Sequence, residues 1–212
     1  MKAFDKKYFS KKIKYIAGVD EAGRGPLAGP VVAAAVIFSR KTNIKGINDS
    51  KQLSEKQRED LYTKIISSAL AYSVSIIEHE VIDEINILNA TMLAMKQAVE
   101  DLNIKPDLVL VDGNRKFKYD LPVVPIVKGD SKSFSIAAAS ILAKVTRDRL
   151  MKNLAAKYPV YLWEHNKGYP TKRHREIIKM VGPSPIHRKS FLKKILTEQQ
   201  ALELNTDLIK VK

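Results

Sequence analysis

Short apolar runs alternate along the chain with longer segments in which apolar residues recur every three or four positions. The short runs predict five strands, at 14–19, 30–38, 69–78, 108–111 and 123–127. In the run at 69–78, apolar and polar residues take turns along the strand. The periodic segments predict helices that begin at Ser54 or span 81–102, 130–157 and 190–204. Strands and helices in this order predict an α/β fold with a central sheet.

The order of these elements also predicts how the sheet is arranged. The first two strands flank a turn rich in glycine and proline, so we expect them to form a central hairpin. A helix precedes the fourth strand, which is typical of a parallel crossover connection. We therefore expect a mixed five-stranded sheet with helices on both faces.

Acidic residues follow three of the predicted strands. Asp20 and Glu21 come at the end of the first strand, Asp112 ends the fourth, and Asp130 follows the fifth. If the first and fourth strands are neighbours, these carboxylates meet where open α/β sheets bind ligands. Clustered carboxylates without histidine or cysteine suit a hard divalent cation, Mg²⁺ or Mn²⁺. Two of them also have an ordinary interpretation, Asp112 as a turn former and Asp130 as a helix cap.

The charge balance indicates the kind of partner. Lys and Arg number 37 against 23 Asp and Glu, a formal net charge of +14, which favours a polyanion such as nucleic acid. Together with an acidic metal site, this charge predicts phosphodiester chemistry by two metal ions. The sequence argues against the phosphate-binding loop of nucleoside triphosphatases, because Arg24-Gly25 stands where that loop needs lysine followed by serine or threonine.

Residue types and segments that the chain lacks exclude several kinds of site and indicate where the protein works. The absence of cysteine excludes disulfides, thiolate zinc sites and cysteine nucleophiles. No apolar run approaches the ~18 residues of a membrane span, and the N-terminus lacks the apolar stretch of a signal peptide. We therefore expect a cytoplasmic, monomeric protein with no membrane association.

The composition changes after Tyr158, from apolar elements to loops and basic residues. This boundary predicts a catalytic domain at 1–158 and a C-terminal substrate-binding extension at 159–212 that packs on the same domain. Trp163 is interpreted as a packing residue. Three basic residues are expected to contact phosphate, while most of the others form a solvated, attractive field; these three are Lys144, Arg147 and Arg188.

A series of motifs carries a resemblance to a known family. The motifs are DEAGRGPLAGPV at 20–31, DSKQL at 49–53, VDGN at 111–114, KGDS at 128–131, AASILAKVTRD at 138–148, NKGYPT at 166–171 and PSPIHRKSF at 183–191. In this order, and along almost the whole chain, the sequence resembles the type 2 ribonucleases H, the bacterial ribonuclease HII group.

The resemblance implies a ribonuclease H-like fold and an endonuclease for the RNA strand of RNA/DNA hybrids. It also implies cleavage of duplex DNA at single embedded ribonucleotides, leaving a 3′-hydroxyl and a 5′-phosphate. It places Mg²⁺ or Mn²⁺ on four catalytic acids, which are Asp20, Glu21, Asp112 and Asp130. It further implies that the RNA-to-DNA junction is read by Gly23, Arg24, Gly25 and Tyr169, and that Lys51 lies near the substrate phosphate.

Two other functions stay open from the sequence. One is a different metal-dependent nuclease or a strand-transfer enzyme of the same fold, which the Gly23-Arg24-Gly25 turn and Tyr169 argue against. The other is a nucleic-acid-binding protein without catalysis, which the complete set of acids disfavours. Tyr169 taken alone has an ordinary interpretation as a packing aromatic, and the turn as a tight surface loop.

Overall fold

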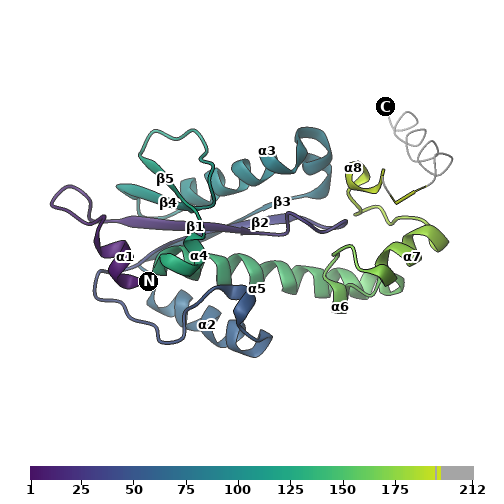
Figure 1. The fold of residues 1–212 in the computed structure, drawn as a ribbon, viewed down its shortest axis with the longest axis horizontal. Coiled ribbons are helices and arrows are strands. Elements are labelled where there is room, and N and C mark those ends of the chain that lie inside the picture. Colours follow the sequence, from purple (N-terminus) through teal and green to yellow (C-terminus); the bar gives the residue numbers. More distant parts are fainter. Residues whose placement is uncertain (194, 197–212) are drawn as a thin grey trace.

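Five strands form one mixed sheet in the computed structural model, which describes residues 1–193, 195 and 196 (Figure 1). The strands are β1 (Ile16–Ala22), β2 (Val31–Ile37), β3 (Ala71–Ile77), β4 (Leu108–Asp112) and β5 (Val123–Ile126). Their order is β3-β2-β1-β4-β5; β2 pairs antiparallel with β1 and β3, and β4 pairs parallel with β1 and β5. The predicted α/β fold and central hairpin are confirmed.

Helices cover both faces of the sheet (Figure 1). The α-helices are α1 (Lys2–Lys6), α2 (Glu55–Ser68), α3 (His79–Glu100), α4 (Gly129–Lys132), α5 (Phe134–Lys157), α6 (Trp163–Asn166), α7 (Lys172–Val181) and α8 (Lys189–Leu192), and the 3-10 turns are η1 (Ser50–Gln52) and η2 (Pro159–Tyr161). Helix α3 packs on one face, against Ala33 and Ala35 of β2, while α2 and α5 pack on the other, against Ala34 and Val36. The predicted capping box at Ser54 is confirmed. None of the helices in the described part of the chain has the length and apolar character of a membrane span.

Strand β1 continues beyond the end predicted from the sequence. It ends at Ala22 instead of residue 19, because β2 supplies ladder partners as far as Val32, opposite Ala22. Asp20 and Glu21 therefore lie within the strand, where the ladder holds their backbone, and not in the turn that follows. The apolar pattern could not show this extension, since the two acids interrupt it.

The helix predicted over 130–157 is two helices, α4 and α5. Ser133 separates them with extended backbone angles, and its hydroxyl caps α5 by accepting a hydrogen bond from Ile136 N at 3.2 Å. Helix α4 follows Lys128, which has a left-handed φ of 56°. Asp130 thus lies in a short separate helix and does not cap the long one.

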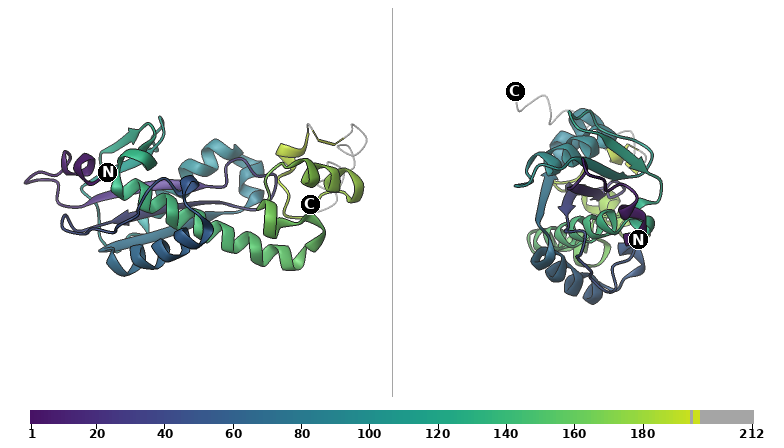
Figure 2. Two further views of the ribbon diagram at one scale, coloured as in Figure 1. Left: turned by 60° about the horizontal axis from the view of Figure 1, so that its bottom comes forward. Right: turned by 90° about the vertical axis from the view of Figure 1, so that its left-hand side faces the viewer.

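The segment after Tyr158 packs on the C-terminal half of α5, at the end of the molecule away from α1 (Figures 1 and 2). Trp163 is fully buried in a cluster with Met151 and Ile178, so it is a packing residue as predicted. Of the helix predicted over 190–204, the structure shows α8, followed by a turn and a bend; the positions after 196 lie outside the described residues.

Candidate active site

Three carboxylates from separate segments of the chain converge beside the sheet. Asp20 lies on β1, Asp112 ends β4, and Asp130 lies on α4. β1 and β4 are parallel neighbours in which Val19 pairs with Val111, so the acids that follow these two residues lie side by side. One oxygen from each of the three carboxyl groups lies within 4.8 Å of the others. The expectation that adjacent first and fourth strands bring the acids together is met for these three.

Backbone N–H groups hold two of these carboxylates in place. Asp112 Oδ1 accepts hydrogen bonds from Gly129 N at 2.6 Å and from Asp130 N at 3.3 Å. Because these donors belong to the first residues of α4, Asp112 organises the short helix that carries Asp130. Asp20 Oδ1 accepts a hydrogen bond from Glu21 N at 2.7 Å. The turn-forming interpretation of Asp112 therefore describes part of what this residue does.

Burial and mutual repulsion raise the pKa of three site carboxyls. The pKa of Asp20 is well above its ordinary value, first because of burial and then because Glu21 and Asp112 are close. Burial raises the pKa of Glu21 against the opposing effect of Arg24, and burial together with Asp130 raises the pKa of Asp112. The ionised acids are thus unfavourable without a cation, and their oxygen donors fit a hard divalent ion.

Glu21 lies at the edge of the carboxylate cluster. Its Oε1 accepts a hydrogen bond from Arg24 Nη1 at 3.3 Å, and it is not one of the three acids within 4.8 Å of one another. Its side chain is largely buried and lines the same cavity as Asp20 and Asp112. The structure therefore gathers three of the four predicted acids around one point and places the fourth beside them, paired with Arg24.

A cavity of about 200 Å³ opens over the acids. Its lining contains every predicted site residue except Asp130, together with Ala22, Ser50, Ser140 and Lys144. Asp130 is linked to the lining through Lys51, whose Nζ lies 3.4 Å from Asp130 Oδ2. Gly25 and Tyr169 are neighbours, because a methyl group added at Gly25 would lie 3.6 Å from the tyrosine ring.

Two buried arginines hold the turn at 23–30 and correct an expectation from the sequence. Arg188 is fully buried and donates to five carbonyl oxygens of the turn, those of Gly23, Arg24, Pro26, Gly29 and Pro30. Arg147 is also buried and donates to the carbonyl oxygens of Ala28, Pro30 and Lys167. The prediction that these arginines contact phosphate is wrong, because backbone carbonyls enclose both guanidinium groups. Lys144, by contrast, does line the cavity.

These arginines keep their charge despite burial. Burial, with the nearby charge of Arg147, lowers the pKa of Arg188 to about 9, and burial lowers the pKa of Arg147 to about 10. Both pKa values stay above neutral pH, so both guanidinium groups are charged. The carbonyl dipoles of the turn replace the water that solvates a surface arginine. The backbone of the turn is therefore fixed by two cations that do not reach the ligand space.

The two outer glycines of Gly23-Arg24-Gly25 have different surroundings. Gly23 has a φ of 99°, and a methyl group there would lie 2.2 Å from Arg147 Nε. Gly25 does not have a positive φ, and among the described residues beyond its two chain neighbours only Tyr169 lies within 4 Å of an added methyl group. Both glycines line the cavity, but a methyl group added at Gly23 would collide with the buried Arg147, whereas one added at Gly25 would lie beside Tyr169.

Two buried histidines support the backbone at Tyr169, and the sequence analysis missed them. His174 Nδ1 lies 2.9 Å from the Tyr169 carbonyl oxygen, and its Nε2 lies 3.1 Å from both Trp163 Nε1 and His187 Nε2. Ser184 N donates to His187 Nδ1 at 2.9 Å. Because the backbone and indole N–H groups only donate, the proton of His187 is on Nε2 and that of His174 is on Nδ1. Burial, with a smaller effect of His174, lowers the pKa of His187 to about 3, so this imidazole is neutral near pH 7.

Comparison with known proteins finds one family along most of the chain. The family model described as Ribonuclease HII matches residues 17–194. A curated Ribonuclease HII of Caldicellulosiruptor bescii is 55% identical over 193 residues, which cover 91% of this chain and 94% of that protein. One from Rickettsia akari is 57% identical over 188 residues, covering 89% and 95%. The crystal structure of the ribonuclease H2 from Pyrococcus horikoshii matches with a TM-score of 0.71 and 34% identity, covering 92% of this chain and 99% of that one.

Proposed function

The chain belongs to the ribonuclease HII family, and we propose that it cuts duplex DNA at single embedded ribonucleotides as well as the RNA strand of RNA/DNA hybrids. Ribonucleases H of this family are metal-dependent endoribonucleases that act on RNA/DNA hybrids. The predicted ribonuclease H-like fold is confirmed by the likeness to a solved ribonuclease H2. Of the functions that the sequence left open, binding without catalysis is therefore excluded.

One observation carries the proposal: three of the four acids (Asp20, Glu21 and Asp112), the Gly23-Arg24-Gly25 turn and Tyr169 border a single cavity. Telling a ribonucleotide from a deoxyribonucleotide requires contact with the 2′-hydroxyl, which both donates and accepts hydrogen bonds. A glycine turn brings backbone groups to that hydroxyl without a side chain in between. Tyr169 lies beside Gly25 and is 40% exposed, so its ring is available to stack on the neighbouring deoxyribose.

We assign metal binding to the four acids Asp20, Glu21, Asp112 and Asp130. Two bound divalent ions, Mg²⁺ or Mn²⁺, would supply an activated water and neutralise the departing 3′-oxygen. The chain holds the carboxylates at fixed points, through the ladder of β1 and β4 and through the α4 turn. Lys51, beside Asp130, attracts the substrate phosphate. Attack by water leaves a 3′-hydroxyl and a 5′-phosphate and needs no covalent nucleophile.

The test is a cleavage map of duplex DNA that carries one ribonucleotide, run beside a uniform RNA/DNA hybrid with Mg²⁺ and Mn²⁺ in turn. We expect one cut on the 5′ side of the ribonucleotide, and the two metals reveal which ion supports the faster reaction. Cleavage of the hybrid alone would overturn the proposal and leave the family's hybrid-cutting activity in place.

Tyr169→Ala is expected to lower kcat/KM at a single embedded ribonucleotide by about 5- to 150-fold, because stacking contacts are typically worth ~1 to 3 kcal/mol. The loss should be smaller on a long RNA tract, where several cleavage registers are available. Tyr72→Ala serves as the control, since Tyr72 is similarly exposed but lies on β3. Equal losses on both substrates would show that Tyr169 supports the groove in general and not the junction.

Gly25→Ala is expected to lower cleavage at a single ribonucleotide by about tenfold, the equivalent of ~1.4 kcal/mol, while the Tm changes by less than about 2 °C. The added methyl group would enter the cavity beside Tyr169 without a backbone clash. Gly23→Ala should instead lower the Tm, because its methyl group meets Arg147 at a positive φ. Cleavage rates and thermal melts of both variants separate the two effects. A Gly25→Ala enzyme with wild-type rates would place the sugar away from this turn.

A further inference from the structure

Lys51 lies on a segment that lacks support from a strand or a long helix. Between β2 and α2 the chain forms one short 3-10 helix, η1, and this element carries Lys51. The Lys51 side chain is 79% exposed, although its Nζ lies 3.4 Å from Asp130 Oδ2. Such an exposed lysine meets a phosphate at a defined point only if its backbone is held, since small displacements from the productive geometry are costly.

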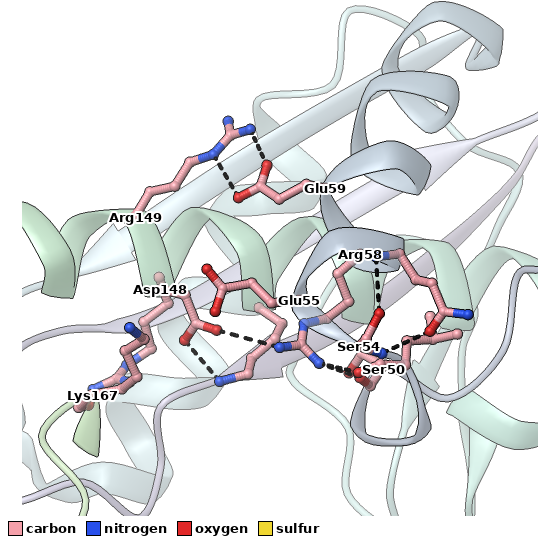
Figure 3. Close-up of polar contacts among 12 residues, drawn as sticks. Ser50, Ser54, Glu55, Arg58, Glu59, Asp148, Arg149 and Lys167 are labelled. Atoms are coloured by element: carbon pink, nitrogen blue, oxygen red, sulfur yellow. Dashed lines mark hydrogen bonds and ion pairs between the residues drawn. The ribbon is translucent and has the colours of Figure 1, made fainter. Parts of the chain in front are cut away.

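Arg58 of α2 closes this segment (Figure 3). Its Nη1 donates to the carbonyl oxygen of Ser50 at 3.0 Å and to that of Leu53 at 2.5 Å, which are the residues that flank Lys51 and Gln52. The Arg58 side chain is only 14% exposed. One planar guanidinium group can satisfy two carbonyls and still face a carboxylate, which a lysine ammonium cannot match.

Asp148 of α5 links Arg58 to a second basic residue. Asp148 Oδ2 lies 4.0 Å from Arg58 Nη2, and Asp148 Oδ1 accepts a hydrogen bond from Lys144 Nζ at 2.7 Å. Lys144 lines the catalytic cavity, with its Nζ 6.0 Å from the centre of the Tyr169 ring. One buried carboxylate thus contacts both the arginine that closes the Lys51 turn and the lysine that faces the cavity.

A hydrogen bond between two buried serines joins the same turn to α5. Ser50 Oγ lies 2.8 Å from Ser140 Oγ, and both residues line the cavity. Neither Arg58 nor Asp148 belongs to the described lining, so neither is placed to touch substrate directly. Their contacts lead instead to Lys51 and Lys144, which do line the cavity.

We propose that Arg58 and Asp148 are positioning residues that fix Lys51 and Lys144 at the catalytic cavity for the phosphates of the substrate strand. The inference rests on the proposed phosphate-binding role of Lys51. Because the backbone at Lys51 and the side chain of Lys144 are held by one framework before substrate arrives, less ordering is required when the duplex binds. Arg58 acts through the backbone of residues 50–53, and Asp148 holds Arg58 and Lys144 in place.

The neighbouring residues on the same two helices provide a matched control. Arg149 of α5 pairs with Glu59 of α2, and Figure 3 shows this pair apart from Arg58 and Asp148. The side chains of Arg149 and Glu59 are 48% and 36% exposed. Among the described residues this ion pair joins α2 to α5 without reaching residues 50–53. A variant of this pair therefore tests whether weaker packing of α2 on α5 is enough to lower activity when the turn at 50–53 keeps its contacts.

The test is a double-mutant cycle, measured as kcat/KM on a uniform RNA/DNA hybrid so that it does not depend on single-ribonucleotide cleavage. Arg58→Met and Lys51→Ala are each expected to lower kcat/KM by about tenfold or more. The double variant should lose no more than about threefold beyond Lys51→Ala, because Arg58 acts mainly through Lys51. Arg149→Met should stay within about twofold of the wild-type rate, as exposed pairs contribute little.

Losses that multiply in the double variant would overturn the inference, since Arg58 would then act independently of Lys51. That result leaves the phosphate role of Lys51 intact, whereas a silent Lys51→Ala removes this role and the inference with it. Thermal melts check that each variant is folded at the assay temperature. If Arg58→Met is not, Arg58→Lys, which keeps a cation beside Asp148, takes its place in the same cycle with the same expectation.

Discussion

Asp112→Asn is expected to lower turnover on an RNA/DNA hybrid by about 10³-fold or more, or ~4 kcal/mol of transition-state stabilisation, while the hybrid still binds. The change removes one negative charge from the metal-binding cluster. An asparagine keeps Oδ1 as an acceptor for Gly129 N and Asp130 N, so the α4 turn should persist. Single-turnover rates at saturating metal and titration of a labelled hybrid measure the two effects. Asp101→Asn, an exposed change at the end of α3, is the control.

The repulsion among the site carboxyls also affects the stability of the protein, which Asp112→Asn tests by thermal melts. Because the pKa of Asp20 is raised above its ordinary 3.8, the native protein holds this proton more tightly than the unfolded chain does. The stability from this carboxyl is therefore fully present below the unfolded pKa and is lost as the pH rises through the folded pKa. A divalent ion at 100 times its Kd should add ~2.7 kcal/mol at neutral pH, a Tm gain of roughly 5 to 11 °C.

Asp112→Asn should lose most of this metal-dependent gain in Tm. Its metal-free Tm should be no lower than that of the wild type, because one of the mutually repelling carboxyls is gone. A wild-type cleavage rate in the variant, or a wild-type Tm that does not respond to metal, would contradict a metal site at these acids.

Arg188→Met is expected to lower the free energy of unfolding by about 3 to 5 kcal/mol, with a fall in Tm of roughly 6 to 20 °C. The methionine fills much of the space but leaves the turn carbonyls at 23–30 without their buried donor. Cleavage should fall as well, since this turn borders the cavity. Arg188→Lys should recover little, because three donors on one nitrogen cannot replace five N–H groups in a plane.

Arg173→Met is the matched control for Arg188→Met. Arg173 lies on α7 with a largely exposed side chain, and its ion pair with Glu176 is 3.8 Å long. Its removal should change the free energy of unfolding by less than about 0.5 kcal/mol. Thermal melts without metal make the comparison. A Tm for Arg188→Met that matches this control would show that the turn keeps its shape without Arg188.

The positions of the acids were predictable because strand pairing and hydrophobic burial follow a local pattern. The apolar run before Asp20 and the run before Asp112 predicted two buried strands, and parallel pairing then placed their carboxyl ends together. The same pattern could not show that Glu21 turns toward Arg24. Consecutive residues of a strand point in different directions, and the partner of each depends on a turn whose path the sequence does not reveal.

The roles of the two buried arginines were predicted wrongly for a related reason. Arg147 and Arg188 stand among many basic residues, and a charge of +14 favours an interpretation as phosphate contacts. Burial of a guanidinium group requires several backbone carbonyls to converge on it, and all but the Lys167 carbonyl come from a turn more than 100 residues away in the chain. His174 and His187 were missed in the same way, since no metal-ligand spacing marks a pair of neutral histidines that only share hydrogen bonds.

The sequence by itself determined the five strands, the hairpin with its glycine turn, the catalytic family and the acids at the strand ends, because periodicity and motifs are properties of neighbouring residues. Only the tertiary structure decided which basic side chains face the cavity and which are enclosed. Lys51 and Lys144 reach the ligand space, whereas Arg58, Arg147 and Arg188 hold backbone in place. The difference lies in where carbonyl oxygens and carboxylates converge, and that is set by the packing of distant segments.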